Sequence, residues 1–320
     1  MKTKKAYFCF EASPSIGAGH AIRSTVIADA LIEMGWECII VTKVESYQFI
    51  ESLQRFKRVE PKQFYENPIE CELVVIDNYS LDEAYEIRFR PYAKRILVID
   101  DLANRRHDCD VLLDQTFGRT EKEYNGLVPV SCKVLAGNDY ILLRNSFEIL
   151  RQKALDKRKK TIEIRRILVS MGGYDSKNHT LKALEFIQES GFKGIVDIAL
   201  GFSAPHQKSV QNMTKGISNE CNLYINADMP KLIYDADLAI AAAGSSVWER
   251  CCLGLPSVLL VTARNQEFIY KTLISKHYAF SSLQETFAYF KKENYFGFAQ
   301  KISSLIVNAT QNVLNLVLKA

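Results

Sequence analysis

The chain has 320 residues and a formal net charge of +4, with 48% hydrophobic and 24% charged residues. This length exceeds what a single hydrophobic core usually serves, so we expect a globular protein of two domains. The basic excess gathers partly in residues 151–166, where it is typical of a solvated helix face or a linker. Without interleaved aromatic residues it does not predict nucleic-acid binding.

No segment approaches the ~18 apolar residues that a membrane helix requires. The first residues run directly into an apolar strand and a glycine loop, which is not the pattern of a signal peptide. The eight cysteines form no C-x-x-C pair and no Cys/His cluster at metal-ligand spacing, so we interpret them as reduced, structural thiols. These features predict a cytoplasmic protein without membrane insertion, and we expect a monomer.

The first predicted elements are a buried strand at residues 7–12 and an amphipathic helix at 22–34, with Gly17, Gly19 and His20 in the loop between them. Glycines let backbone N–H groups approach a ligand, and a helix N-terminus favours negative charge, so this loop suits a phosphorylated ligand. It lacks the third glycine and the acidic residue of a dinucleotide site, and it lacks the Gly-Lys-Ser/Thr of a P-loop. A nicotinamide enzyme and an ATP-binding P-loop are therefore disfavoured.

Further strands are predicted in both halves of the chain. They are near-continuous runs of Val, Ile and Leu that alternate with helices, the pattern of a parallel sheet covered on both faces. Those of the first half lie at 38–42, 72–77, 95–100 and 110–114, and those of the second at 166–170, 195–200, 238–243 and 257–261.

This repeated scheme predicts an α/β protein of two doubly wound, Rossmann-like domains, 1–156 and 157–320, with the hinge near 150–163. The amphipathic tail, 283–320, can pack back on the first domain. Ligands of such sheets bind at the carboxyl ends of strands. The loops at 17–20, 77–79, 172–173 and 244–246 are therefore expected to face one interdomain cleft.

A Gly-x-Gly-His loop in one Rossmann-like half and a Gly-Ser-Ser-x-x-Glu segment in the other resemble the GT-B superfamily, especially its peptidoglycan N-acetylglucosaminyltransferase group. Over residues 8–280, the motifs are more similar still, in order and spacing, to the UDP-sugar hydrolases of pseudaminic acid biosynthesis. They are Ile16-Gly17-Ala18-Gly19-His20-x-x-Arg23, Asp77-Asn78-Tyr79, Val98-Ile99-Asp100-Asp101-Leu102, His107-Asp108-Cys109-Asp110, Tyr140-x-Leu142-Leu143-Arg144, Ser170-Met171-Gly172-Gly173-x-Asp175 and Ala243-Gly244-Ser245-Ser246-x-x-Glu249.

The resemblance implies hydrolysis of UDP-2,4-diacetamido-2,4,6-trideoxy-β-L-altropyranose to UDP and the free sugar. Water would attack the anomeric carbon with inversion, and no metal or other cofactor is implied. The chain departs from the family at Cys9 and Glu11, where arginine and aspartate are common, and at Ser80, where glycine is usual. These departures bear on the choice of sugar more than on the reaction class.

In the first half, His20, Asp77 and Tyr79 are the candidate catalytic residues. Imidazole titrates close to neutral pH, which suits a general base, although His20 can instead cap the helix or bind phosphate passively; the resemblance favours the base. Asp77 can orient His20 or the water, or cap a helix that begins near Ser80. Tyr79 can hold the sugar or the leaving oxygen.

Substrate-binding candidates in the first half are Gly17, Gly19 and Arg23. Arg23 lies one helical turn beyond His20 and can orient the pyrophosphate, or it can be a surface arginine. The neighbouring pair Asp100 and Asp101 can hold a metal, act as an acid and a base, or terminate a loop.

In the second half, Gly172 and Gly173 permit close approach of the nucleotide, and Ser245 and Ser246 at a helix N-terminus suit the diphosphate. Glu249 can accept both ribose hydroxyls or form a capping box with a preceding serine, and the resemblance favours the ribose. Asn265 and Gln266 can reach amide or hydroxyl groups of the sugar.

Two other functions stay open. A GT-B glycosyltransferase would pass the sugar to an acceptor and should carry an apolar and basic patch on the first domain, which the sequence does not clearly show. A nucleotide-sugar binding protein would not turn its ligand over.

Overall fold

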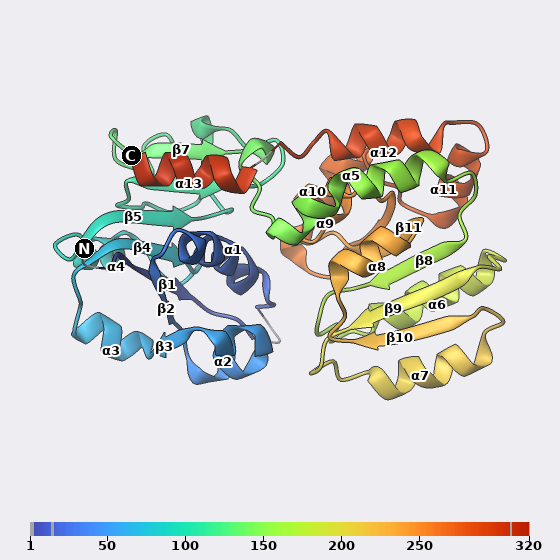
Figure 1. Cartoon of the computed structure of the whole chain (residues 1–320), viewed down its shortest axis with the longest axis horizontal. Helices are drawn as coiled ribbons and strands as arrows, with labels where there is room; N and C mark the ends of the chain where they lie inside the picture. Colours follow the sequence, from blue (N-terminus) through green and yellow to red (C-terminus); the bar gives the residue numbers. More distant parts are fainter. Residues whose placement is uncertain (1–2, 14–15, 308, 320) are drawn as a thin grey trace. The chain divides into compact units, whose positions relative to one another are not determined.

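The computed structural model describes residues 3–13, 16–307 and 309–319. The chain forms two compact units, Met1–Leu143 with Val307–Ala320 and Arg144–Ile306 (Figure 1). Each unit contains one parallel sheet, so the predicted α/β class with two doubly wound halves is confirmed. The expected boundary after residue 156 falls inside a continuous helix, α5 (Asn145–Lys160).

Unit 1 has a seven-stranded sheet of order β3-β2-β1-β4-β5-β6-β7. Its elements are β1 (Lys5–Phe10), α1 (Gly19–Glu33), β2 (Glu37–Val41), α2 (Val44–Phe49), β3 (Lys57–Val59), α3 (Pro61–Glu66), β4 (Cys71–Asp77), α4 (Glu83–Phe89), β5 (Ala93–Ile99), β6 (Val111–Asp114), β7 (Lys133–Ala136) and α13 (Ala309–Lys319), with short 3₁₀ turns at Glu51–Arg55, Glu121–Tyr124 and Asn138–Tyr140. The five predicted strands are confirmed. The two that were missed, β3 and β7, are short edge strands that each begin with lysine and carry no long apolar run.

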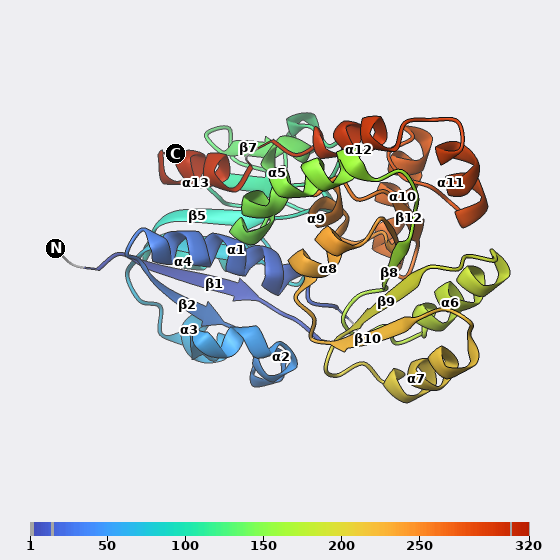
Figure 2. The same ribbon diagram turned by 45° about the vertical axis from the view of Figure 1, so that its right-hand side comes forward.

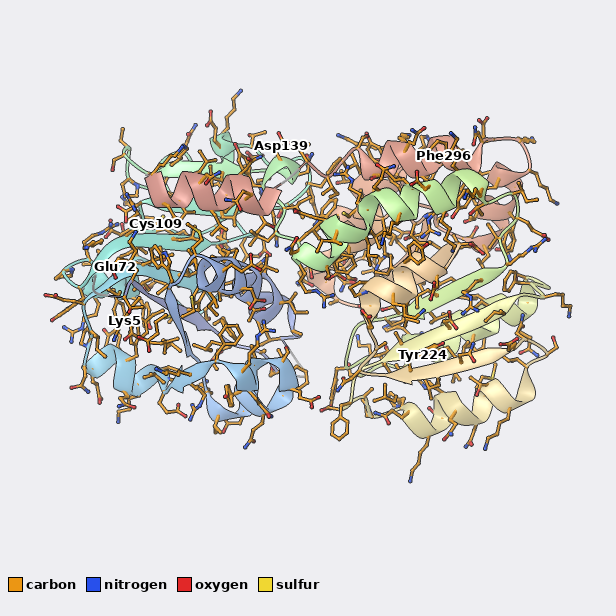
Figure 3. All side chains as sticks on the ribbon, viewed as in Figure 1. Lys5, Glu72, Cys109, Asp139, Tyr224 and Phe296 are labelled. Carbon is orange, nitrogen blue, oxygen red and sulfur yellow. The ribbon has the colours of Figure 1, made fainter. Side chains whose placement is uncertain are left out.

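Both faces of this sheet are covered, as continuous apolar strands require. On β1, Phe8 and Phe10 face a core that α1 and α13 complete, whereas Tyr7 and Cys9 face a core that α3 and α4 complete. Cys109, labelled in Figure 3, belongs to the second core. The alternation of β1 side chains thus separates two cores within one unit.

The C-terminal helix α13 belongs to unit 1, and Figures 1 and 2 show it beside that unit's sheet. Its residues Val313, Leu314 and Val317 are buried in the core that α1 lines. At its start, Thr310 Oγ1 accepts from the Leu143 backbone N–H and donates to the Leu143 carbonyl, both at 3.0 Å. The apolar face of the amphipathic tail is therefore buried against a sheet whose strands precede it by more than 160 residues in the sequence.

Unit 2 has a five-stranded sheet of order β10-β9-β8-β11-β12. Its elements are α5, β8 (Arg166–Ser170), α6 (His179–Glu189), β9 (Ile195–Leu200), α7 (Gln207–Gly216), β10 (Cys221–Ile225), α8 (Met229–Asp235), β11 (Leu238–Ala242), α9 (Val247–Cys252), β12 (Ser257–Leu260), α10 (Glu267–Ser275), α11 (Leu283–Phe290) and α12 (Tyr295–Ser303), with a 3₁₀ turn at Arg264–Gln266. The four predicted strands are confirmed, and β10 was missed. Within the described ranges, no helix is long and apolar enough to cross a membrane.

The basic segment near residue 157 is not simply a solvated face or a linker. Arg158 is fully buried and donates to the carbonyls of Ile233, Ala236 and Leu253. Lys157 Nζ donates to the carbonyl of Asp235 at 2.6 Å. Cations stabilise the unpaired carbonyls at a helix C-terminus, so these two residues of α5 hold the end of α8.

Candidate active site

The glycine loop turns the chain sharply from β1 into α1. The Gly17 N–H donates to the Ser13 carbonyl at 2.7 Å, and Gly17 has φ = +88°, a conformation that L-residues rarely adopt. Gly19 is the first residue of α1. His20, Arg23, Ser24, Ile27 and Leu31 then share the buried face of the helix, polar at its first turn and apolar beyond.

His20 contacts Asp77, the last residue of β4. Their Nδ1 and Oδ1 atoms lie 2.5 Å apart, and His20 is only 6% exposed while Asp77 is fully buried. The N-cap of α1 is Ala18, which excludes helix capping by His20. Because an ionised carboxylate only accepts hydrogen bonds, Nδ1 carries the ring proton and Nε2 keeps its lone pair in the neutral ring.

Arg23 surrounds the same carboxylate and does not lie at the surface. Its Nε and Nη2 donate to the two oxygens of Asp77 at 2.6 Å each, a bidentate pair, and its Nη1 donates to Asp101 at 2.9 Å. Burial by itself raises the pKa of Asp77, but Arg23 and then His20 outweigh burial and lower that pKa to about 2. Asp77 is therefore a carboxylate at neutral pH, and it does not cap α4, whose N-cap is Asp82.

Tyr79 completes the cluster. Its hydroxyl donates to Asp101 Oδ1 at 2.7 Å, and its ring meets the His20 ring edge-on, with centroids 4.5 Å apart. Burial and the Asp101 charge raise the pKa of Tyr79, so its hydroxyl is protonated at neutral pH. The structure thus brings together His20, Arg23, Asp77 and Tyr79, and it adds Asp101.

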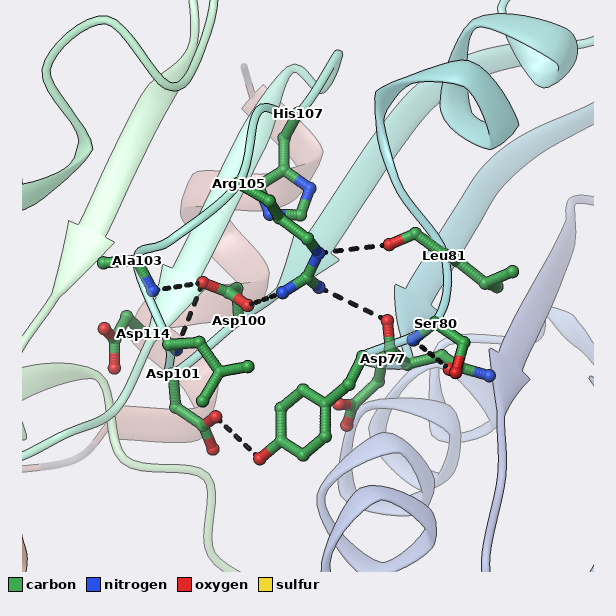
Figure 4. A network of polar contacts seen from close by, with 12 residues as sticks. Asp77, Ser80, Leu81, Asp100, Asp101, Ala103, Arg105, His107 and Asp114 are labelled. Carbon is green, nitrogen blue, oxygen red and sulfur yellow. Dashed lines mark hydrogen bonds and ion pairs between the residues drawn. The ribbon is translucent and has the colours of Figure 1, made fainter. Parts of the chain in front are cut away.

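The two neighbouring aspartates have different environments (Figure 4). Asp100 is fully buried and accepts from the Ala103 backbone N–H at 2.8 Å and from Arg105 Nη1 at 2.7 Å. Arg105 also donates to the carbonyls of Asn78 and Leu81, which ties the loop after β5 to the loop after β4. Asp100 therefore terminates a loop, whereas Asp101 contacts the His20 cluster through Arg23 and Tyr79.

In unit 2, the loop after β8 lies against the end of β9. Gly172 has φ = +94°, and the Gly173 carbonyl accepts from the Gly201 N–H at 2.9 Å. A Cβ atom on Gly201 would lie 2.2 Å from that carbonyl oxygen, so the approach of the two backbones requires glycine there. Gly201 was missed, although its place directly after a predicted strand was a usable signal.

Ser246 is the N-cap residue of α9, but its side chain makes no capping hydrogen bond. Its Oγ instead accepts from Arg250 Nη1 at 3.0 Å, while Ser245 is exposed. Glu249 Oε1 accepts from Arg144 Nη2, also at 3.0 Å. Because the Ser246 side chain makes no capping hydrogen bond, Ser246 and Glu249 do not form a capping box. The Glu249 side chain is 13% exposed. Burial raises the pKa of Glu249, and the neighbouring charge of Arg144 lowers it by a smaller amount. Arg144, present in the motif, was not assigned to the site.

Asn265 and Gln266 lie in the 3₁₀ turn after β12. Asn265 is exposed. Gln266 Oε1 accepts from the Thr262 N–H at 3.0 Å, and its Nε2 lies 3.4 Å from where a Cβ of Gly244 would be. Gln266 therefore lies against the loop that leads into α9.

Comparison with known proteins agrees with this architecture. MurG of Acinetobacter baumannii superimposes with a TM-score of 0.67 at 15% identity, over 99% of this chain and 100% of MurG. The calicheamicin glycosyltransferase CalG4 gives 0.56 at 13% identity, over 99% of this chain and 98% of CalG4. The chain has the GT-B fold. At these identities, the likeness concerns the fold alone.

The sequence comparison is more specific. The chain is 29% identical over 282 residues to the UDP-2,4-diacetamido-2,4,6-trideoxy-β-L-altropyranose hydrolase of Campylobacter jejuni, covering 86% of this GT-B chain and 97% of that enzyme. The resemblance to the UDP-sugar hydrolases is therefore confirmed as a similarity along most of both chains. No protein-family profile matches the chain.

Proposed function

We propose that this GT-B protein hydrolyses a UDP-linked 2,4-diacetamido-2,4,6-trideoxy sugar to UDP and the free sugar, with inversion at the anomeric carbon. The observation that carries the proposal is the buried contact of 2.5 Å between His20 and Asp77. An imidazole whose Nδ1–H is held by a carboxylate has Nε2 available as a base, which is what activation of a water requires. The similarity to the Campylobacter jejuni hydrolase supports the choice of substrate.

In the proposed reaction, His20 Nε2 accepts a proton from water as the water oxygen bonds to the anomeric carbon. The bond from that carbon to the β-phosphate oxygen breaks, and UDP leaves with the electron pair. Asp77, ionised because its pKa is about 2, stabilises the imidazolium that forms. Since the contacts of Arg23 are with Asp77, Asp101 and, at 3.0 Å, His20 Nδ1, we assign to it the positioning of Asp77 and the His20 ring rather than contact with the pyrophosphate.

The proposal assigns UDP to unit 2. The diphosphate would meet the backbone at Gly172 and Gly173 and the hydroxyls of Ser245 and Ser246. The positive φ of Gly172 gives the first of these two loops the conformation that close approach of a backbone to a ligand needs. A glutamate oxygen that accepts from Arg144 can also accept from a ribose hydroxyl, so we assign the ribose to Glu249. Asn265 and Gln266 remain the candidates for polar groups of the sugar.

The deciding experiment is incubation with the UDP-sugar, without an acceptor, in ¹⁸O-labelled water. We expect release of UDP and one ¹⁸O atom on the anomeric hydroxyl of the sugar, with proton NMR of the first product showing the inverted anomer. The control is Asp29→Asn, which removes a half-exposed ion pair with Arg55 and should react at the parental rate.

Three outcomes would contradict the proposal. Label on the phosphate would mean attack at phosphorus. Release that depends on an added acceptor would instead identify the alternative, a GT-B glycosyltransferase. Binding of the UDP-sugar without release would identify a binding protein.

A further inference from the structure

The carboxylate of Asp101 lies between two side chains of the His20 cluster. Oδ1 accepts from the Tyr79 hydroxyl at 2.7 Å, and Oδ2 accepts from Arg23 Nη1 at 2.9 Å. The main-chain carbonyl of Asp101 accepts from Arg119 Nη2 at 3.0 Å, which fixes the backbone as well. The Asp101 side chain is 26% exposed, and Arg23 outweighs the effect of burial and lowers the pKa of Asp101, so it is ionised at neutral pH.

An ionised carboxylate can only accept, so the direction of the Tyr79 hydrogen bond is determined. A phenol has one proton, and that proton points at Asp101. The Tyr79 oxygen then has only lone pairs to offer to any other group. It can meet an N–H or an O–H of a ligand, but it cannot donate to a phosphate oxygen, a carbonyl or a leaving oxygen.

The position of Tyr79 places this acceptor close to the proposed base. Its ring meets the His20 ring with centroids 4.5 Å apart and an interplanar angle of 82°. In the proposed reaction the water activated by His20 attacks the anomeric carbon, so a ligand group that reaches the Tyr79 oxygen would belong to the part of the sugar next to that carbon. In a 2,4-diacetamido sugar, the donor adjacent to the anomeric carbon is the amide N–H on carbon 2.

We propose that Asp101 is a positioning residue that makes the Tyr79 oxygen an acceptor for the N–H of the 2-acylamino group. This inference rests on the proposed function for the identity of the ligand. The polarity that Asp101 imposes on Tyr79 is independent of that function and can be measured in the free protein. It also removes Tyr79 as a proton donor to the leaving oxygen, which the sequence had left open.

The substitution Asp101→Asn reverses this polarity without changing the size of the side chain. Arg23 decides how the new amide is oriented, because a guanidinium requires an oxygen opposite it. The amide oxygen then faces Arg23, and the amide NH₂ faces the Tyr79 oxygen. Tyr79 must turn its own proton away from residue 101, so the group it presents to a ligand becomes a donor.

The first measurement is the titration of Tyr79 by NMR of protein labelled with ¹³Cζ-tyrosine, with the signal assigned by its loss in Tyr79→Phe. The charged or titratable groups near this hydroxyl are Asp101, Arg23, Asp77 and His20. Removal of the Asp101 charge should make Tyr79 ionise at a lower pH in Asp101→Asn than in the parent protein. The Asp29→Asn control should leave the titration unchanged.

The second measurement compares two substrates, the UDP-diacetamido sugar and its analogue with an ester oxygen in place of the nitrogen on carbon 2. The parent protein should have a KM roughly tenfold lower for the amide, the value of one hydrogen bond. Asp101→Asn should lose this preference through a higher KM for the amide, with kcat changed less than about threefold and with the inhibition constant of UDP unchanged.

The results separate the two claims. An unchanged Tyr79 titration in Asp101→Asn, or a retained preference for the amide, overturns the role of Asp101 even if the protein is an efficient hydrolase. If the parent protein hydrolyses neither substrate, the proposed function and the assignment of the ligand both fail. In that case a shifted Tyr79 titration would still confirm the polarity of the hydrogen bond.

Discussion

The Nδ1 atom of His20 and the Oδ1 atom of Asp77 lie 2.5 Å apart although 57 positions separate these residues in the chain. The sheet explains this approach. Strand β4 pairs with β1, with Asp77 opposite Phe10, so β4 ends beside the loop that leads from β1 into α1. His20, in the first turn of α1, therefore lies within hydrogen-bond distance of Asp77, the last residue of β4.

The first prediction concerns His20→Asn. Asparagine can still face Asp77 but has no basic nitrogen, so kcat for the UDP-sugar should fall by about 10²–10⁴-fold, the usual contribution of a general base. The affinity for UDP, measured by calorimetry, should stay within about twofold of the parent value because the proposed UDP contacts are in unit 2. Near-parental turnover would remove His20 from the mechanism.

The second prediction concerns the acid side of the stability profile. The folded-state pKa of Asp77 is about 2, below the usual 3.8, so its ion pairs stabilise the native state above pH 3.8 and are lost as the pH falls toward 2. In this window, the free energy of unfolding of the parent should fall more steeply than that of Asp77→Asn, by up to about 1.4 kcal/mol per pH unit. Urea unfolding at stepped pH measures the slopes.

The control for this experiment is Asp139→Asn, an exposed carboxyl of the same unit. It should keep the parental slope. Equal slopes for the parent and for Asp77→Asn would mean that Asp77 has no stabilising ion pair in the folded protein.

The sequence predicts a large part of this fold and site because the signals are local. Nine apolar runs in the sequence predict strands of two parallel sheets. His20, Asp77 and Tyr79 lie at strand ends or at the first turn of a helix, where ligands of such sheets bind. The missed strands β3, β7 and β10 lie at sheet edges, where continuous apolar sequence is not required.

What the sequence did not predict depends on tertiary partners. The sequence does not distinguish Asp100 from its neighbour Asp101. In the structure Arg105 donates a hydrogen bond to Asp100, whereas Arg23 donates one to Asp101. Arg158 belongs to a run that looks solvated, and only the packing of α5 against the end of α8 shows that it is buried. The hydrogen-bond partners of long side chains such as arginine depend on the tertiary structure and cannot be inferred from spacing along the chain.

The third prediction tests the ribose role of Glu249. Glu249→Gln keeps the shape but loses the charge, so UDP affinity should fall roughly tenfold or more, as expected for hydrogen bonds to a charged group. The affinity for 2′-deoxy-UDP should fall less, because one of the two hydroxyls is already absent. Calorimetry with both nucleotides measures the difference, with Glu185→Gln, on the exposed face of α6, as the control. An equal loss for both would argue against the ribose contact.

The fourth prediction concerns helix α13. Leu314 is 1% exposed in the core of unit 1, so Leu314→Ala should lower the free energy of unfolding of that unit by about 2–5 kcal/mol. The two tryptophans lie one in each unit, Trp36 in unit 1 and Trp248 in unit 2, so Trp248→Phe leaves Trp36 fluorescence to report on unit 1. The exposed neighbour Asn315, changed to alanine, should leave the Trp36 transition in place.

The last prediction concerns the order in which cysteines react. Cys132 Sγ lies 3.6 Å from Cys109 Sγ, and hydrogen bonding by the Cys109 thiol lowers the pKa of Cys132. Cys221 is also partly exposed, but burial raises its pKa, and the other six cysteines are buried. The thiolate is the reactive form, so brief treatment with iodoacetamide should modify Cys132 first, as peptide mapping would show. Cys109→Ala removes this contact and should slow the reaction, whereas modification of Cys221 ahead of Cys132 would contradict the lowered pKa of Cys132.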